Sequence, residues 1–386
     1  MGSCGFLTGF PQRLIRILFL ALILSLLLAL IACQPSTPTP LPSPQPSATV
    51  VPAPVPTPTP KPTASAIPTA MPSAPTTIAL PADDASHASD VEWWYYNGYL
   101  EAADGSEYGF HAAMFELGGN IVPIEILMGH LAITDHQTET FTFGQVLGQK
   151  LGEDPLEGFA ATVKGWRVAG FDGEYALAGS VEGYDLDLSF SAVKPPVLHG
   201  GDGLLDFHEA GKTYYYTYPR LEVTGMLTVG DVSQEVIGSG WLDHQWGDFR
   251  AFEVGWDWFS LQLNDDTELV FFSVWAPDGR ILGRLATFVN EDGSAVTIDG
   301  DDIVLRSNTT WTSPKTGGQY PSNWQIDIEA LGMSLSLEPL VEDSEFIPPD
   351  PITPIYWEGE VVVRGLREGR PVEGRGFVEL VGYAGG

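Results

Sequence analysis

The residues best suited to chemistry lie together at positions 243–248, Asp-His-Gln-Trp-Gly-Asp. If this stretch is a β-strand, Asp243 and Gln245 lie on one face and His244 and Trp246 on the other, because side chains alternate along a strand. A tryptophan wall lowers the local dielectric and raises the pKa of a carboxylic acid, which then can donate a proton. The cluster therefore predicts an acid/base site. The alternative is that His244 and Trp246 only cap an interface between two domains.

A second group of residues is aromatic and suits the wall of a binding pocket. Glu92 precedes four consecutive aromatic residues, and a buried glutamate requires a partner. Such aromatic rings could line an apolar or sugar-binding pocket, or they could form an ordinary seam of the core. Residues 356–359 repeat the pattern, and Trp256 and Trp258 flank Asp257. The predicted ligand-binding residues are Glu92, Trp93, Trp94, Tyr95, Trp256, Trp258, Tyr356 and Trp357.

Metal and cofactor sites are not indicated. The seven histidines are scattered, and no two have the short spacing typical of ligands on one element; His130 and His136 stand six apart. The sequence also contains no Gly-x-Ser-x-Gly elbow, phosphate loop or dinucleotide fingerprint. We therefore expect no metal and no cofactor.

The elements that must position these residues are short β-strands. Residues 186–190 and 334–338 alternate apolar and polar side chains with period two, as strands do. Asp-Gly pairs at 104–105, 278–279 and 292–293 are typical of hairpin turns. No stretch shows a long helical periodicity. The pattern predicts an all-β, antiparallel fold of sandwiches or barrels.

The globular region also contains an internal repeat. Residues 93–100 resemble 256–263, Trp166 and Trp324 follow these stretches at similar distances, and the closing strand 236–243 resembles 372–379. We predict two related β domains, at 83–249 and 250–386. A residue found in both copies is then expected to be architectural, whereas one found in a single copy is a better candidate for chemistry. His244 corresponds to Leu380 and therefore falls in the second group.

The N-terminal part predicts export and lipid attachment. Arg13 and Arg16 precede an apolar run at 17–31, which ends in Leu-Ile-Ala-Cys and resembles the lipobox of bacterial lipoproteins. Residues 1–33 are therefore predicted to be a signal peptide with Cys33 as the lipidated residue; an uncleaved anchor is the alternative. Residues 34–82 hold 16 of the 31 prolines and predict a disordered tether. The expected location is the extracytoplasmic face of the cell membrane, with the lipid bilayer as a partner.

Charge excludes one class of partner. Residues 83–386 carry all 50 acidic residues but only 15 of the 18 lysines and arginines, which gives a formal net charge of −35. Such a surface repels phosphates, so we expect no nucleic-acid binding.

These motifs together resemble one known family. The stretches 92–95, 241–247, 255–259, 356–359 and 376–383 are similar, in this order, to the AttH-type lipocalin-like proteins, which include hydroxyneurosporene synthase, a carotenoid 1,2-hydratase. The resemblance implies two lipocalin-like β-barrel or sandwich domains with a ligand cleft near their junction. It also implies that an aspartate, here matched by Asp257, protonates an isoprenoid double bond close to His244 and Trp246. His111 stands where many relatives have glutamine.

Three functions follow as hypotheses. The first is a lipid-anchored, lipocalin-like protein that binds an apolar or amphiphilic small molecule without chemistry, with a membrane transport protein as a further partner. The second is a hydro-lyase of the carotenoid 1,2-hydratase kind, with Asp257, His244, Trp246 and Asp243 as catalytic residues. The third is a surface protein that binds or processes glycans. A buried carboxylic acid with a raised pKa beside a cavity would favour the enzyme.

Overall fold

The computed structural model describes residues 77–119, 121, 124–152, 154–350 and 352–384. The predicted signal peptide, Cys33 and nearly all of the predicted tether lie outside these residues, so the predictions of a lipid anchor and a membrane location stay predictions. Among the described residues, no helix is long and apolar enough to cross a membrane. Regular structure there consists of β-strands and five short 3-10 helices, Ala82–Asp84, His208–Ala210, Ala251–Glu253, Gly300–Asp302 and Glu329–Leu331.

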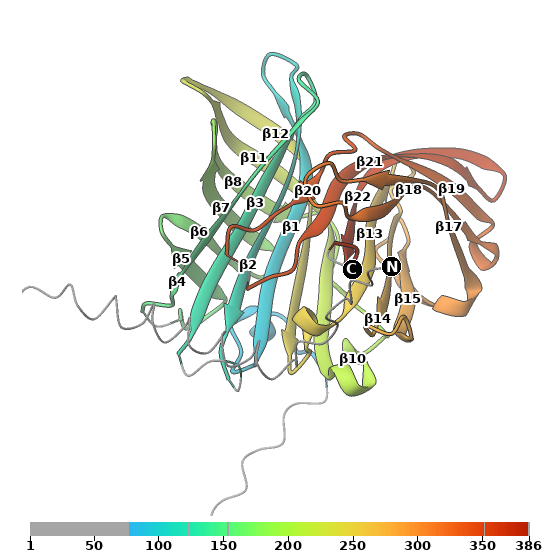
Figure 1. Cartoon of the computed structure of the whole chain (residues 1–386), viewed down its shortest axis with the longest axis horizontal. Helices are drawn as coiled ribbons and strands as arrows, with labels where there is room; N and C mark the ends of the chain where they lie inside the picture. Colours follow the sequence, from blue (N-terminus) through green and yellow to red (C-terminus); the bar gives the residue numbers. More distant parts are fainter. Residues whose placement is uncertain (1–76, 120, 122–123, 153, 351, 385–386) are drawn as a thin grey trace, which may run out of the picture. The chain divides into compact units, whose positions relative to one another are not determined.

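The first half of this region forms one curled antiparallel sheet, coloured from blue to yellow-green in Figure 1. Its strand order is β4-β3-β2-β1-β12-β11-β8-β7-β6-β5, and β9 and β10 add to β11. The strands are β1 (Val91–Ala102), β2 (Glu107–Leu117), β3 (Ile126–Asp135), β4 (Thr140–Gln149), β5 (Phe159–Val163), β6 (Trp166–Phe171), β7 (Glu174–Val181), β8 (Tyr184–Ala192), β9 (Val197–Leu198), β10 (Leu204–Asp206), β11 (Lys212–Val229) and β12 (Val232–Gly247).

The second half forms another curled antiparallel sheet, in orange and red in Figure 1. Its order, β16-β15-β14-β13-β22-β21-β19-β18-β17, repeats the arrangement of the first sheet, and β20 pairs with β21. The strands are β13 (Gly255–Leu263), β14 (Glu268–Trp275), β15 (Ile281–Val289), β16 (Ala295–Asp299), β17 (Ile303–Thr312), β18 (Gln319–Ile328), β19 (Met333–Pro339), β20 (Glu345–Phe346), β21 (Tyr356–Arg367) and β22 (Arg370–Val381).

The all-β prediction is confirmed, and so are its local signals. The two alternating stretches form β8 and β19, in which buried and exposed residues alternate. All three Asp-Gly pairs lie in turns between consecutive strands, and the φ angles of Gly105, Gly279 and Gly293 are 84°, 83° and 82°. Glycine adopts this left-handed conformation without the strain that a Cβ atom would cause.

The repeat is visible in how the sheets contact each other. Asn97 of β1 lies opposite Trp241 in its sheet, just as Ser260 of β13 lies opposite Phe377. These equivalent residues meet, because the Asn97 side chain donates a hydrogen bond to Ser260 Oγ (3.1 Å). Equivalent positions contact each other only near a two-fold axis, so the sheets are related by approximate two-fold symmetry.

One part of the predicted repeat is not confirmed. Trp166 lies on β6, whereas Trp324 lies on β18. The two sheet orders align when β12 and β11 are matched with β22 and β21. The next strand is then β8 in the first sheet and β19 in the second, and the strand after it is β7 and β18, respectively. The similar spacing of these two tryptophans in the two halves is therefore coincidental.

The central strands of both sheets are buried on both faces, so each sheet packs against two cores. Each sheet encloses its own core, to which Tyr96 and Leu242 contribute in the first and Phe259 and Val378 in the second. A third core lies between the sheets and includes Trp241, Trp258, Phe272 and Phe377.

A buried ion network joins the sheets beside this third core. Glu268 of β14 is fully buried and accepts hydrogen bonds from Lys194 Nζ (2.9 Å) and Arg220 Nε (2.6 Å), which both belong to the first half. Two cations on one buried carboxylate compensate its lost hydration. The network therefore stabilises the contact between the two sheets, and the candidate site described below lies at this contact.

Candidate functional site

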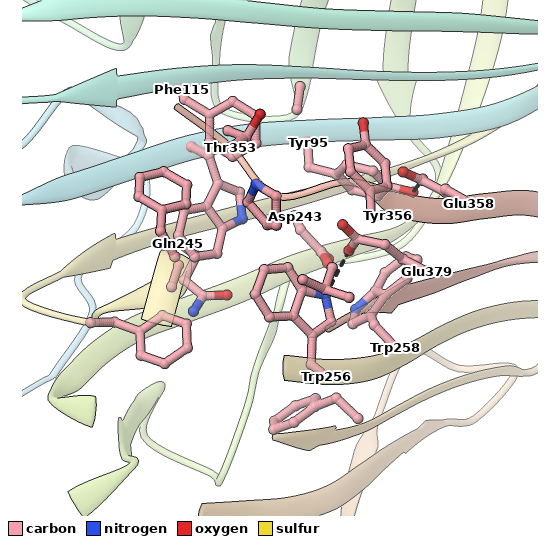
Figure 2. A pocket seen from close by; sticks show the side chains of 18 of the residues that line it. Tyr95, Phe115, Asp243, Gln245, Trp256, Trp258, Thr353, Tyr356, Glu358 and Glu379 are labelled. Atoms are coloured by element: carbon pink, nitrogen blue, oxygen red, sulfur yellow. Dashed lines mark hydrogen bonds between the residues drawn. The ribbon is translucent and has the colours of Figure 1, made fainter. Parts of the chain in front are cut away.

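An aromatic pocket lies between the two sheets, where β1 and β12 face β13 and β22 (Figure 2). Its volume is about 100 Å³, which is below the usual 300–1,000 Å³ of a site that encloses a whole drug-sized ligand. The space fits a single ring or the end of a longer apolar molecule. The aromatic and imidazole rings that line it are Trp93, Tyr95, His111, Phe115, His130, Phe207, Tyr215, Phe249, Phe252, Trp256, Trp258, Phe272 and Tyr356.

Strand alternation brings these side chains together. Positions two apart on one strand share a face, so β1 supplies Trp93 and Tyr95, and β13 supplies Trp256 and Trp258. On β12 the same rule gives Asp243 and Gln245, which confirms the predicted facing of that strand; the intervening His244 points to the opposite side.

Asp243 is a carboxylate fixed by donors of its own sheet. It is 3% exposed and accepts hydrogen bonds from Tyr215 (2.5 Å), Thr217 (2.5 Å) and Trp241 (2.7 Å). Burial raises the pKa of Asp243 to about 6, although these donors act in the opposite direction. Trp258 of the second sheet donates in turn to the Tyr215 hydroxyl (2.9 Å). Asp243 therefore organises the floor of the pocket.

Glu358 of β21 forms the second acidic position. It is 1% exposed, and the Tyr95 hydroxyl of the other sheet donates to its Oε1. Burial raises the pKa of Glu358 well above its usual range, and the nearby Glu379 adds to this effect. His111 Nε2 lies 3.4 Å from Glu358 Oε2 without a hydrogen-bond partner. Since burial, with a smaller contribution from His130, lowers the pKa of His111 to about 3, this histidine is neutral and the pair is not an ion pair.

Glu379 of β22 is the carboxyl group most available to a ligand. Trp256 Nε1 donates to its Oε2 (2.9 Å; dashed in Figure 2), and no described residue donates to its Oε1. Part of its surface is accessible because it lines the pocket. Surrounding protein nevertheless raises the pKa of Glu379 to about 7, and the charge of Asp243 adds to that rise. A substantial fraction of Glu379 is therefore protonated at neutral pH.

This arrangement can transfer a proton to an apolar molecule. A neutral carboxylic acid with a pKa near the operating pH is well suited to general acid catalysis. The indoles of Trp256 and Trp258 could stabilise a developing cation through their electron-rich faces. Among the described residues, the pocket lacks a lysine or arginine that would neutralise such an acid.

The structure brings six of the predicted site residues to this pocket, namely Trp93, Tyr95, Asp243, Trp256, Trp258 and Tyr356. The other six do not line it. Trp357 belongs to the second-sheet core and donates to the Glu342 carbonyl (2.7 Å). Asp257, which lies between Trp256 and Trp258 on β13, points away from the pocket. Its carboxylate accepts from the Tyr383 hydroxyl (2.7 Å), and burial raises its pKa to about 6.

The remaining predicted residues lie together inside the first sheet. Trp94 stacks on His244 with ring centroids 4.8 Å apart, and Trp246 stacks on His87 at 4.0 Å. Glu92 Oε1 lies 2.7 Å from His244 Nε2 and 2.8 Å from His87 Nδ1. The structure therefore does not join Asp257, His244, Trp246 and Asp243 in one site.

This second cluster contains groups that could hold a metal ion. Donor atoms of His87, Glu92 and His244 lie within 4.8 Å of one another. Their sequence positions do not show this, because the cluster forms only when β1 pairs with β12 and Glu92 comes to lie opposite Trp246.

Sequence reasoning missed Glu358, Glu379 and Tyr215 as pocket residues. One signal was present for Glu379, because the repeat aligns it with Asp243. Equivalent strands of the two halves meet near the two-fold axis. Asp243 of the first half and Glu379 of the second half therefore line the same pocket. Residues common to both copies are therefore site candidates here, contrary to the expectation that they are architectural.

Comparisons with known proteins agree with this architecture. The AttH-like family model matches residues 71–383. The crystal structure of an AttH candidate from Nitrosomonas europaea is 25% identical, covers 82% of this chain and 100% of its own, and superimposes with a TM-score of 0.73. Kievitone hydratase from Nectria haematococca is 19% identical, with a TM-score of 0.67 over 80% of this chain and 94% of its own. No curated protein sequence matches.

A third structure shares the fold at lower similarity. CghA with Sch210972 is 13% identical and has a TM-score of 0.53 over 78% of this chain and 90% of its own. The family match extends over most of the chain and includes both sheets. With two related, curled antiparallel sheets and an aromatic pocket between them, this chain belongs to the AttH-like family.

Proposed function

We propose that this protein binds an apolar or amphiphilic, unsaturated small molecule in the pocket between its sheets and protonates it with Glu379. The observation that carries the proposal is that Glu379 lines the pocket with an Oε1 to which no described residue donates, on a carboxyl group whose pKa is about 7 among aromatic rings. Binding alone requires only the pocket; a protonated acid facing it supports chemistry of the hydratase or related lyase kind.

The proposed reaction is a hydration that regenerates its acid. The Glu379 carboxyl gives its proton to one carbon of a C=C bond, and the other carbon becomes a carbocation beside Trp256 and Trp258. A water oxygen bonds to that carbon. The proton that the water loses returns to the Glu379 carboxylate, so the net change is addition of one water. Kievitone hydratase is a hydratase by name, and its shared fold makes this reaction class reasonable for the present chain.

The size of the pocket favours a ligand that enters by one end. A cavity of about 100 Å³ holds the reacting end, and the rest of a longer molecule remains outside. An isoprenoid tail has this form and carries the required double bond.

The location belongs to the same proposal. The basic residues, apolar run and lipobox-like end at Cys33 support a lipid anchor on the extracytoplasmic face, and the proline-rich tether would separate the globular part from the bilayer. A transport partner in that membrane could deliver or accept the ligand.

The test is water addition to a panel of isoprenoid alkenes, measured as product mass in H₂¹⁸O. The wild-type chain is expected to add one labelled water. Glu379→Gln removes the acid while preserving shape and should lower the rate 10²- to 10⁴-fold. Asp257→Asn is the matched control and should keep the rate. Full activity of Glu379→Gln, or loss with Asp257→Asn alone, would overturn the assignment of the acid.

The second candidate function is ligand binding without catalysis. It is favoured by the hydrogen bonds that the other two carboxyl groups of the pocket already accept. Asp243 and Glu358 are already held by Tyr215 and Tyr95, as in a pocket whose acids are structural. Tight binding of an unsaturated ligand that is recovered unchanged would support this candidate over catalysis.

A further inference from the structure

Inside the first sheet, the imidazole rings of His87 and His244 both face the carboxylate of Glu92. Glu92 is 0% exposed and His244 is 0% exposed, whereas His87 borders a surface groove that also includes Asp83 and Trp246. The His87 backbone N–H donates to Glu92 Oε2 (2.7 Å), which leaves Oε1 between the two imidazoles.

Hydrogen bonds behind the cluster fix how His244 can act. Tyr216 donates its hydroxyl proton to Asp84, and the Tyr216 oxygen lies 3.0 Å from His244 Nδ1. Nδ1 must therefore carry the proton and donate to Tyr216. In a neutral imidazole this leaves the Nε2 lone pair facing Glu92 Oε1 at 2.7 Å. A lone pair and a carboxylate oxygen repel each other at this distance unless a positive charge lies between them.

The charge between them is either a proton or a metal ion. A proton would join only Glu92 and His244, whereas a metal ion can also bind His87 Nδ1, which faces the same Oε1 at 2.8 Å. A divalent ion suits the donors, since two imidazole nitrogens and one carboxylate oxygen form a common ligand set for Zn²⁺. Ligand atoms of a tetrahedral ion stand roughly 3.3 Å apart at bonds of about 2.0–2.1 Å. The present contacts of 2.7 and 2.8 Å would therefore open by about half an ångström.

The groups behind the two histidines also match those of metal sites. A ligating histidine usually directs its other nitrogen to a carboxylate or a similar acceptor, which fixes its tautomer. His244 reaches Asp84 through Tyr216, and His87 Nε2 lies 3.7 Å from Asp83 Oδ1. Both aspartates belong to the short helix Ala82–Asp84, so one segment supports both histidines.

We propose that His87, Glu92 and His244 bind one divalent transition-metal ion, with Zn²⁺ as the best match, and that this ion ties the segment before β1 to the first sheet. The site is separate from the pocket between the sheets, and its occupancy does not depend on the proposed reaction. Its fourth position faces the groove and would hold water.

The test is a Co²⁺ titration of the full-length, chelator-treated chain in detergent, read by visible absorption, with Zn²⁺ as competitor. One Co²⁺ per chain with the absorption of a four- or five-coordinate ion, displaced by Zn²⁺, is expected. His87→Asn should weaken binding at least tenfold, and Zn²⁺ should raise the melting temperature of the wild type but not of this variant. His208→Asn removes an exposed histidine elsewhere and should change neither result.

Glu92→Gln provides a second variant within the cluster and should also lose the spectrum. Cys4 and Cys33 remain in every variant, so a loss in His87→Asn or Glu92→Gln cannot come from thiol ligands. The proposal is overturned if the wild type gives only the spectrum of aqueous Co²⁺, or if His87→Asn binds as tightly as His208→Asn.

Discussion

Glu358 of β21 and Glu379 of β22 are direct cross-strand partners, and both line the pocket between the sheets. Two carboxylates so close in an apolar surround cannot both be ionised without a large cost. Burial first, and then this proximity, raises the pKa of Glu358, whereas Glu379 keeps an oxygen open to the pocket. The pair thus supplies a protonated acid where a ligand would lie.

The first prediction concerns pH and stability. The pKa of Glu379 is about 7 in the folded chain and about 4.5 when unfolded. The folded state therefore holds the proton more tightly, so the stability from this group is complete below about pH 4.5 and is lost as pH rises to about 7. Glu379→Gln should remove this loss and raise the free energy of unfolding at pH 8 by about 1–3 kcal/mol after allowance for its partial exposure.

Thermal unfolding between pH 5 and 8.5 measures this effect. Glu373→Gln, at an exposed position of the same strand, is the control and should leave the pH dependence unchanged. A wild type whose melting temperature does not fall over this range relative to Glu379→Gln would contradict a raised pKa at Glu379.

The second prediction separates a structural carboxyl group from a reactive one. Asp243→Asn puts an amide N–H₂ against donors from Tyr215, Thr217 and Trp241, so buried donors lose their acceptor. We expect a loss of about 2–3 kcal/mol in urea unfolding. Thr217→Val removes one of these donors and also the partner of His199 Nε2 (2.7 Å), and should cost about 1–2 kcal/mol. Equal stability of Asp243→Asn and the wild type would show that these hydrogen bonds do not stabilise the floor of the pocket.

A third prediction tests what holds the sheets together. Lys194→Met leaves the fully buried Glu268 with Arg220 as its remaining cation and should cost about 2–3 kcal/mol. Lys315→Met breaks an ion pair whose side chains are 47% and 46% exposed and should cost less than about 0.5 kcal/mol. Chemical denaturation of both variants gives the comparison; similar small losses would mean that Lys194 does not stabilise the contact.

Much of the fold could be predicted from local sequence, because strand alternation and Asp-Gly turns depend on neighbouring residues. The facing of Asp243 and Gln245 on β12 was predictable for the same reason. The sequence did not indicate which face of a central strand meets the other sheet. Strands such as β1 and β13 are buried on both sides, so apolar residues occur on both faces and give no direction.

The candidate acid illustrates this limit. Asp257 and Glu379 lie on neighbouring strands, yet strand alternation sends Asp257 toward Tyr383 and Glu379 into the pocket. The resemblance to hydratases pointed to Asp257, and Glu379 was not among the predicted site residues, although the repeat aligns it with Asp243. Only the meeting of equivalent strands at the two-fold axis shows that a duplicated carboxylate can serve one site.

The most direct test of ligand binding in this pocket is native mass spectrometry with lipid extraction on the protein as it is purified from its native host. Ala113 is 8% exposed and lines the pocket, so Ala113→Phe fills it, whereas Ala103→Phe changes an exposed site outside the pocket. We predict that the wild type and Ala103→Phe carry an apolar molecule that Ala113→Phe lacks. An empty wild type, or the same molecule on a folded Ala113→Phe, would contradict it.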